Sequence, residues 1–445
     1  MPAEPEPDPP PAAEYRVADL ELFPAGDGLS LVYSRDTGAA AFYRPETVEL
    51  LSSLTDFRTL DDHLRHSLPE GMPAGAAHRD LLQLSRAGFL VRRDQPPAGA
   101  DIPEPAPIST VGLPTRDRLQ SLRRAVTSYA ENCLAHGREV RFVVTDDSPE
   151  PGGAQRCRAM LADLAGRLGI AVSHAGRAER ARFAAELAEA GGIPAEVARY
   201  ACLGETPDEP ADGAPAAETG PAETTVGANR NSLLLHTVGE RLFSADDDTV
   251  CQLAAAPGQD GRVRLSTGGD PLDTWFYPDR ATAFAALEPI NQDLLGLHEQ
   301  FLGRPPAAVL VAAAGAAEAS AAGTAEASAG GSAWADRLPP PLLRRLRTRP
   351  GRILLTGNGT VGDCGWDNPH FALFSRGESF GRLTSSAAEY RRARASRELA
   401  QAVRQPTITE WPQPRLAMCI GLDNTGLLAP FPPTGRGEEV AFGAI

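Results

Sequence analysis

Short runs in which apolar and polar residues alternate dominate the first hundred positions, and glycine, proline or aspartate bounds each run. Alternation with a period of two is typical of half-buried strands, whereas apolar residues three and four positions apart indicate helices. We therefore predict three strands, at 15–23, 29–34 and 38–43. Three helices should follow, at 44–54, 58–68 and from 78 to about Gly88, and a short apolar run comes after the third. Together these elements predict a small winged-helix-like α+β domain over residues 14–94.

A proline-rich stretch separates this region from a longer one with a different pattern. Beyond it, apolar strand-like runs alternate with amphipathic helical runs, which is typical of an α/β domain. We therefore predict a linker at 95–107 and an α/β domain over 108–445. Three other stretches have the low-complexity composition of disordered segments, at 1–13, 205–225 and 312–333.

The overall charge limits the classes of partner. The 445 residues carry a formal net charge of -15, from 43 basic and 58 acidic side chains, whereas proteins that bind nucleic acid usually show a basic balance. No stretch has the 18 uninterrupted apolar residues that would indicate a membrane-spanning helix. The acidic N-terminus does not resemble a signal peptide, and the six cysteines contain no CxxC pair. We therefore expect a cytoplasmic protein that binds neither nucleic acid nor membrane.

All 43 basic residues are arginine, because the sequence contains no lysine. Phosphate-binding loops of the Walker type, Schiff-base enzymes and enzymes with a lysine general base all need that residue. The sequence excludes each of these classes.

Three aspartates, Asp246, Asp247 and Asp248, follow directly on the apolar run at 241–245. Adjacent carboxylates repel one another, so either a cation or water should surround them. A strand's carboxyl end in an open α/β sheet is where ligands bind, and hard carboxylate oxygens there suit Mg²⁺ or Mn²⁺. The alternative is a solvated acidic turn, and the triplet alone leaves both possibilities open.

Two other segments carry polar residues where a predicted strand ends: Pro107–Arg118, with "PTRDR", and Phe142–Ser148, with "DDS". Along the chain the order is strand–PTRDR–helix, strand–DDS, and NRN–helix–strand–DDD. This combination resembles the family 2 glycosyltransferases, with their first-strand P-T-x-x-R, DDxS-like strand end, NRN helix start and D-x-D. The resemblance implies a GT-A (nucleotide-diphospho-sugar transferase) α/β fold and a UDP- or GDP-sugar donor. It places Mn²⁺ or Mg²⁺ on Asp246 and Asp248, and the donor nucleotide on Pro114, Thr115, Arg116, Asp146, Asp147, Arg230, Asp246 and Asp247.

The resemblance returns near the C-terminus, where Glu438 and Glu439 follow a loop rich in glycine and proline. In this family an acidic pair supplies the general base for the acceptor, and we expect Glu438 or Glu439 to do so here. If neither does, Asp363 or Asp367 would be the base. Such enzymes usually continue with further helices near the acceptor. We therefore also expect this sequence to be truncated at its C-terminal end.

An apparent dinucleotide-binding motif in the C-terminal third of the sequence does not have the expected context. Gly357–Gly362 reads G-x-G-x-x-G after a predicted strand, but a dinucleotide-binding turn must open a helix. Gly365 and Pro369 follow too soon for that, so we expect a loop on the acceptor side.

The N-terminal domain resembles the small peptide chaperone of pyrroloquinoline quinone biosynthesis, on the residues "DGLSLVYSRDTGAAAFYRPETVELLSSL" and "LLQLSRAGFLV". In that family a leader peptide adds as a strand to a sheet edge and packs on the third helix. The resemblance implies leader-peptide contacts at Ala39, Ala40, Ala41, Phe42, Tyr43, Leu81 and Leu82. The alternative is a purely structural domain.

Taken together, we expect a metal-dependent, inverting glycosyltransferase that acts on a ribosomally made precursor peptide held by its leader. Two alternatives remain: a glycosyltransferase with a small-molecule or polysaccharide acceptor, and an inactive peptide-binding scaffold.

Overall fold

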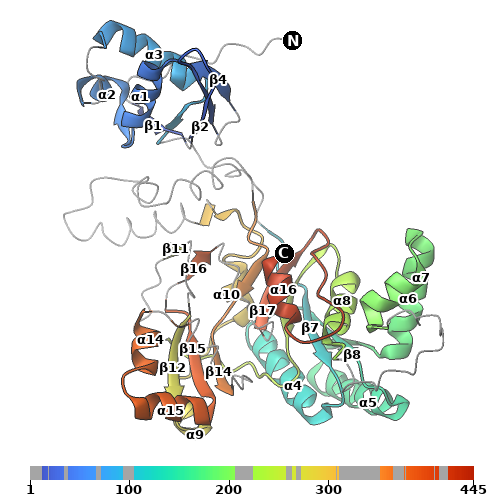
Figure 1. Ribbon diagram of the computed structural model, residues 1–445. Coiled ribbons are helices and arrows are strands. Elements are labelled where there is room, and N and C mark those ends of the chain that lie inside the picture. Colours follow the sequence, from blue (N-terminus) through green and yellow to red (C-terminus); the bar gives the residue numbers. More distant parts are fainter. Residues whose placement is uncertain are drawn as a thin grey trace, which may run out of the picture. The chain divides into compact units, whose positions relative to one another are not determined.

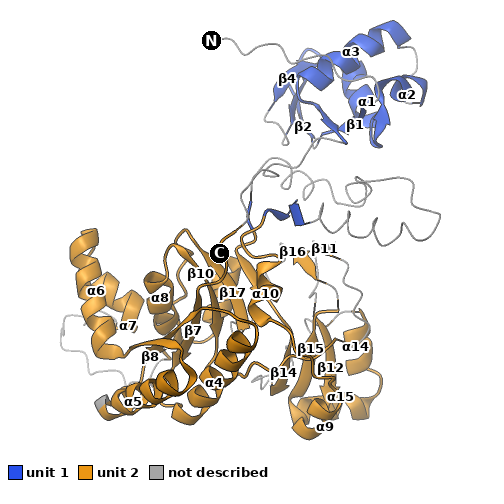
Figure 2. Ribbon diagram, turned by 180° about the vertical axis from the view of Figure 1, so that it is seen from behind, with its two compact units in different colours: residues 1–103, 305–352 blue, residues 104–304, 353–445 orange. Residues whose placement is uncertain are grey.

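The computed structural model describes residues 13–18, 20–34, 39–66, 72–93, 105–205, 224–256, 263–266, 272–306, 308–309, 351–363, 375, 377–404, 406–409 and 419–445. The chain divides into two compact units, residues 1–103 with 305–352 and residues 104–304 with 353–445 (Figure 2). Most of the predicted tail, linker and low-complexity insertions lies outside the described residues. Ala13, the last residue of the predicted tail, is an exception, because it is buried in the core of the first unit.

The first unit contains two three-stranded sheets, whereas the sequence predicted three strands in all. The predicted first strand is divided at Ala18, whose N–H donates to the carbonyl of Phe89, so the chain leaves one sheet before it enters the other. One sheet has the order β5-β1-β6 and the other β2-β3-β4. The strands are β1 (Glu14–Val17), β2 (Leu20–Pro24), β3 (Ser30–Ser34), β4 (Ala40–Tyr43), β5 (Arg58–Thr59) and β6 (Leu90–Arg92).

The three predicted helices of this unit are present as α1 (Pro45–Ser53), α2 (Leu60–His66) and α3 (Ala74–Arg86) (Figure 1). Pro45 begins α1, where its missing N–H has no helical partner to lose. The helices and both sheets bury a common core that includes Val32, Leu50 and Leu81. Since Leu81 is fully buried, it has no surface to offer a peptide, which corrects the expectation for that residue. Leu82 is half-buried.

The second unit is built on a six-stranded sheet with the order β13-β17-β10-β7-β8-β9. Strands β10, β7, β8 and β9 are parallel, whereas β17 is antiparallel to both of its neighbours. The strands are β7 (Thr110–Thr115), β8 (Arg141–Asp146), β9 (Ala171–Ala175), β10 (Glu240–Ala245), β13 (Leu355–Gly357) and β17 (Cys419–Asn424).

Helices cover both faces of this sheet, so the strands are buried on each side. On one face, Phe142 and Val144 pack in a core with α4 (Leu119–Ala135), α5 (Pro151–Leu168) and α10 (Leu294–Glu299). On the other face, Val143 packs with the side chains of Leu233 and Leu234, from α8 (Val226–His236). Gly112 in β7 lets α8 approach closely, because a Cβ there would lie 2.4 Å from Leu233. The α8 layer continues with α6 (Arg177–Gly191), α7 (Ala195–Leu203) and α16 (Glu438–Ala444).

A second, three-stranded sheet in this unit has the order β12-β15-β14 (Figure 1). The remaining elements are β11 (Arg264–Ser266), β12 (Asp273–Tyr277), α9 (Arg280–Ala285), β14 (Thr360–Asp363), α14 (Gly377–Leu383), α15 (Ala387–Ser396), β15 (Glu398–Ala402) and β16 (Thr407–Thr409). The G-x-G-x-x-G segment runs from the end of β13 into β14, so a strand rather than a helix follows the first two glycines. A dinucleotide-binding turn is therefore absent there, as the sequence predicted. Within the described residues, none of the helices combines the length and the apolar composition needed to cross a membrane.

Candidate functional site at the sheet's carboxyl edge

Three parallel strands bring most of the predicted site residues to one edge of the large sheet. Strand β7 lies between β10 and β8, so the ends of all three meet, at Thr115, at Asp146 and at Ala245, which directly precedes the triplet. From β7 the chain builds β8 on one side and β10 on the other, so the strand order reverses between β7 and β10. Ligands bind at such reversals in open α/β sheets. The sequence-predicted residues therefore converge where this architecture favours a binding site.

Each aspartate of the triplet has its own surroundings. Asp247 is only 4% exposed, and its Oδ2 accepts a hydrogen bond of 2.6 Å from the Thr115 hydroxyl. Burial raises the pKa of Asp247 to about 6, although Thr115 and Arg118 oppose this shift. The side chains of Asp246 and Asp248 are more exposed, at 26% and 51%. The outer two aspartates are thus the ones that present carboxylate oxygens to a ligand.

Arginines of the same chain compensate the triplet's charge. Arg118 Nη1 lies 2.6 Å from Asp248 and 3.3 Å from Asp247, and Arg230 Nη2 lies 2.7 Å from Asp246. Charge-assisted pairs of this kind are shorter and stronger than neutral hydrogen bonds. The three adjacent carboxylates are therefore tolerated because two guanidinium groups face them.

The NRN segment of α8 gives three different contacts, because successive helical residues point about 100° apart. Asn229 donates to the carbonyls of Thr115 and Thr145 and so ties the helix to the ends of β7 and β8. Asn231 donates to the carbonyl of Phe431 and accepts from its N–H, which clamps the C-terminal segment. Arg230, between them, is directed at the site.

Arg230 joins the triplet to the predicted general base. Besides its pair with Asp246, its Nε lies 3.7 Å from Glu438 Oε1, and all but 4% of its side chain is buried. Burial alone would lower the pKa of Arg230, but the carboxylates of Asp246, Glu439 and Glu438 raise it. A single buried cation therefore holds two acidic groups that are far apart in the sequence, Asp246 and Glu438, in one cluster.

Close packing of the C-terminal segment on α8 places Glu438 at the site. A Cβ on Gly227 would lie 1.8 Å from the carbonyl oxygen of Pro432, so only glycine permits this approach. The rings of Phe431 and Phe442 stack with centroids 4.0 Å apart. Glu438 is 5% exposed, and burial, reinforced by Glu439, raises the pKa of Glu438 although Arg230 opposes the rise. A carboxylate with a raised pKa accepts a proton more readily near neutral pH.

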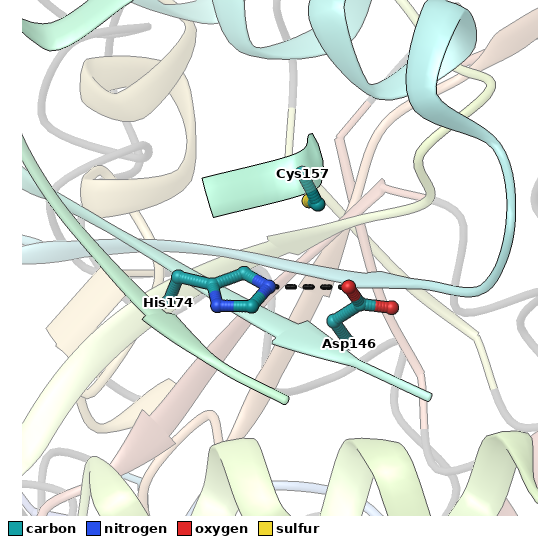
Figure 3. A group of neighbouring side chains, drawn as sticks. All are labelled: Asp146, Cys157 and His174. Atoms are coloured by element: carbon teal, nitrogen blue, oxygen red, sulfur yellow. Dashed lines mark hydrogen bonds and ion pairs between the residues drawn. The ribbon is translucent and has the colours of Figure 1, made fainter. Parts of the chain in front are cut away.

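The paired aspartates at the end of β8, Asp146 and Asp147, are placed differently from what the sequence suggested. Asp146 is fully buried, and its carboxylate accepts hydrogen bonds from the N–H and hydroxyl of Ser148 and contacts His174 Nε2 at 3.1 Å (Figure 3). Its partner Asp147 is 2% exposed and pairs with Arg177 and Arg180. Neither carboxylate is exposed. In this arrangement the base and ribose of a nucleotide therefore cannot reach the oxygens of Asp146 and Asp147, as the sequence had suggested they would.

Asp146 also belongs to a group with the donor types of a zinc site. Potential ligand atoms of Asp146, Cys157 and His174 lie within 4.8 Å of one another (Figure 3). However, the carboxylate of Asp146 already accepts two hydrogen bonds from Ser148 and contacts His174. The buried His174 Nδ1 also has no hydrogen-bond partner, whereas metal-bound histidines usually anchor that atom. We interpret the group as a hydrogen-bonded support for the end of β8.

The remaining predicted donor contacts divide into two sets. Pro114 is buried within β7, and the Thr115 hydroxyl donates a hydrogen bond to the carboxylate of Asp247. Arg116 turns away from the triplet, with its Nη1 3.8 Å from Asp147. Arg118, the arginine that reaches the triplet, was not among the predicted contacts. A signal for it was present, because the arginine of P-T-x-x-R falls at position 118 when the motif begins at Pro114.

Comparisons with known proteins add little to this description. No protein-family model matches the chain, and no curated protein matches it. Among solved structures, a match is the crystal structure of E. coli MccB with succinimide, which is 9% identical over 52% of this chain and 69% of that chain. Its TM-score is 0.17. Agreement this weak does not indicate a shared fold, so it supports no inference about function.

Proposed function

We propose that the chain is a metal-dependent glycosyltransferase that moves a sugar from a UDP- or GDP-sugar onto a ribosomally made peptide. The observation that carries the proposal is the cluster at the sheet's carboxyl edge. Asp246, Arg230 and Glu438 form a continuous set of contacts there, and Asp246 and Asp248 of the triplet are partly exposed and exposed, respectively. The strand-order reversal at this edge also supports it, because nucleotide ligands favour such positions.

The carboxylates of Asp246 and Asp248, one partly exposed and one exposed, suit a hard divalent cation, Mn²⁺ or Mg²⁺, because such ions prefer carboxylate ligands. When bound, the cation supplies positive charge for the departing diphosphate. Arg230 cannot leave its buried place easily, so it fixes the orientation of Asp246 and adds a second positive charge beside the diphosphate.

Transfer then follows a single displacement with inversion. An acceptor hydroxyl or thiol attacks the anomeric carbon, the bond from that carbon to the diphosphate oxygen breaks, and the diphosphate leaves with its electron pair. A carboxylate of the terminal acidic pair accepts the acceptor's proton. Glu438 is the better candidate, because its raised pKa favours proton acceptance near neutral pH.

Peptide capture is assigned to the first unit. Strand β4 lies at one end of the β2-β3-β4 order, so its outer backbone groups can pair with an added strand. Register places Phe23, Leu31 and Phe42 opposite one another on one face. Phe42 is 61% exposed and Phe23 is 47% exposed. An extended leader on β4 would cover part of this apolar face, and its tether would raise the local concentration of the core peptide.

Calorimetric titration with UDP and GDP tests the donor and metal roles. We expect wild type to bind the nucleotide tightly in Mn²⁺ and weakly in EDTA. In Asp248→Asn the affinity in Mn²⁺ should fall to the value in EDTA. Asp163→Asn is a matched control, since Asp163 is similarly exposed on α5 (55%). Equal affinity in Mn²⁺ and EDTA for both nucleotides would contradict the proposal.

A further inference from the structure

Arg118 has an arrangement that the proposed function does not yet use. Its Nη1 atom alone contacts two members of the triplet, at 2.6 Å from Asp248 Oδ2 and 3.3 Å from Asp247 Oδ1. A guanidinium group and a divalent cation compete for the same carboxylate lone pairs. Arg118 therefore stands where a cation ligated by Asp248 would have to be accommodated.

The backbone at this position is fixed while the side chain is not. Asp117 adopts a left-handed conformation, with φ of 55°, and its N–H donates to the Ser148 hydroxyl at 2.9 Å. The carbonyl of Arg118 accepts the N–H of Leu122 at 2.9 Å, at the start of α4. By contrast, the Arg118 side chain is 57% exposed. It can therefore swing without unwinding the helix.

The second arginine on the triplet lacks this freedom. Arg230 is buried and lies between Asp246 and Glu438. Moving it would leave two carboxylates without a counter-ion, one of them buried, and an unpaired buried charge lowers the stability of the fold strongly. Arg118 is the guanidinium partner of Asp247 and Asp248. Withdrawal of Arg118 would leave these two carboxylates without it, and their two negative charges match the charge of a divalent cation.

We propose that Arg118 is a displaceable counter-ion, which holds Asp247 and Asp248 until a divalent cation takes Asp248 and then pairs with the donor's diphosphate. The inference rests on the proposed function, because it needs both a cation and a diphosphate at this edge. It gives Arg118 opposite effects on the two ligands. It competes with the metal, and it assists the nucleotide.

The test uses the full chain and two separate binding measurements. Mn²⁺ affinity without nucleotide is measured from the free-ion signal in electron paramagnetic resonance, and UDP and GDP affinities at saturating Mn²⁺ are measured by calorimetry. In Arg118→Ala we expect Mn²⁺ to bind about threefold more tightly, the scale of one exposed ion pair. We expect the nucleoside diphosphate to bind about tenfold more weakly, the scale of one hydrogen bond to a charged group.

Two further variants separate this role from a structural one. Arg118→Lys keeps the charge and should recover part of the nucleotide affinity, whereas Arg123→Ala removes an exposed arginine of the same helix and should leave both affinities at the wild-type value. A simple loss of folding would weaken both ligands together. Opposite shifts in Arg118→Ala therefore support the inference.

Two results overturn it. If wild type binds Mn²⁺ through Asp248 but Arg118→Ala binds Mn²⁺ no more tightly, or binds the diphosphate equally well, Arg118 is not a displaceable counter-ion and the proposed function stands. If wild type binds no Mn²⁺, both the proposed function and this inference fail.

Discussion

Replacement of the buried aspartate of the triplet, Asp247→Asn, should stabilise the protein in a pH-dependent way. Burial raises the pKa of Asp247 from 3.8 to about 6, so the folded state binds more protons than the unfolded state between these values. Wild-type stability therefore falls as the pH rises through that window. Asparagine has no charge to desolvate and can still accept the Thr115 hydroxyl through its amide oxygen.

The magnitude follows from the size of the shift. At 1.36 kcal/mol per pH unit, a shift from 3.8 to about 6 makes the variant more stable than wild type by about 3 kcal/mol at pH 7.5 and by only about 1 kcal/mol at pH 4.5. These values already include the contact with Arg118, because Arg118 lowers the pKa of Asp247 and burial outweighs it.

Urea unfolding followed by circular dichroism at both pH values measures this difference. Asp248→Asn is the matched control, since the Asp248 side chain is 51% exposed. This substitution should change the free energy of unfolding by less than about 1 kcal/mol at either pH. A pH-independent gain, or a loss of stability in Asp247→Asn at pH 7.5, would refute the burial argument.

Three other predictions follow from the contacts described. Arg230→Met should lower the free energy of unfolding by about 3 kcal/mol, because it leaves Asp246 and the buried Glu438 without their cation; a change below about 1 kcal/mol in urea unfolding would contradict this. Ala40→Pro removes an N–H from edge strand β4 and should weaken a fluorescein-labelled leader peptide in anisotropy titrations of the full chain. Unchanged leader affinity would exclude strand addition at β4. Glu438→Gln should slow sugar transfer by about a hundredfold while nucleotide binding is kept, and Glu439→Gln should have a much smaller effect; similar rates for both variants and wild type would move the base to Asp363 or Asp367.

The strands and helices around the candidate site could be predicted well from local pattern. Strands that end in "PT", "TDD" and "SADDD" must place those residues at one edge once the sheet is parallel, and the structure has them there. The helix over the NRN segment and its end before Gly239 also follow from spacing and glycine chemistry.

Side-chain direction was less predictable, because it depends on contacts between distant segments. Asp146 is turned inward by His174, which lies on the next strand, and nothing in the spacing of the DDS segment indicates that contact. Leu81 is buried because both sheets of the first unit pack on α3, whereas the sequence suggested one sheet. The division of the predicted first strand at Ala18 has the same origin, a backbone hydrogen bond to Phe89 far along the chain.

Release of nucleoside diphosphate from a UDP- or GDP-sugar tests the central claim most directly. Chromatographic assay of the full chain with each donor, in Mn²⁺ or in EDTA, measures hydrolysis by water and so requires no peptide acceptor in the reaction. The account predicts release that requires Mn²⁺ and is abolished in Asp248→Asn but not in Asp163→Asn. Absence of release from a panel of UDP- and GDP-sugars, or equal release in EDTA, would contradict a metal-dependent glycosyltransferase.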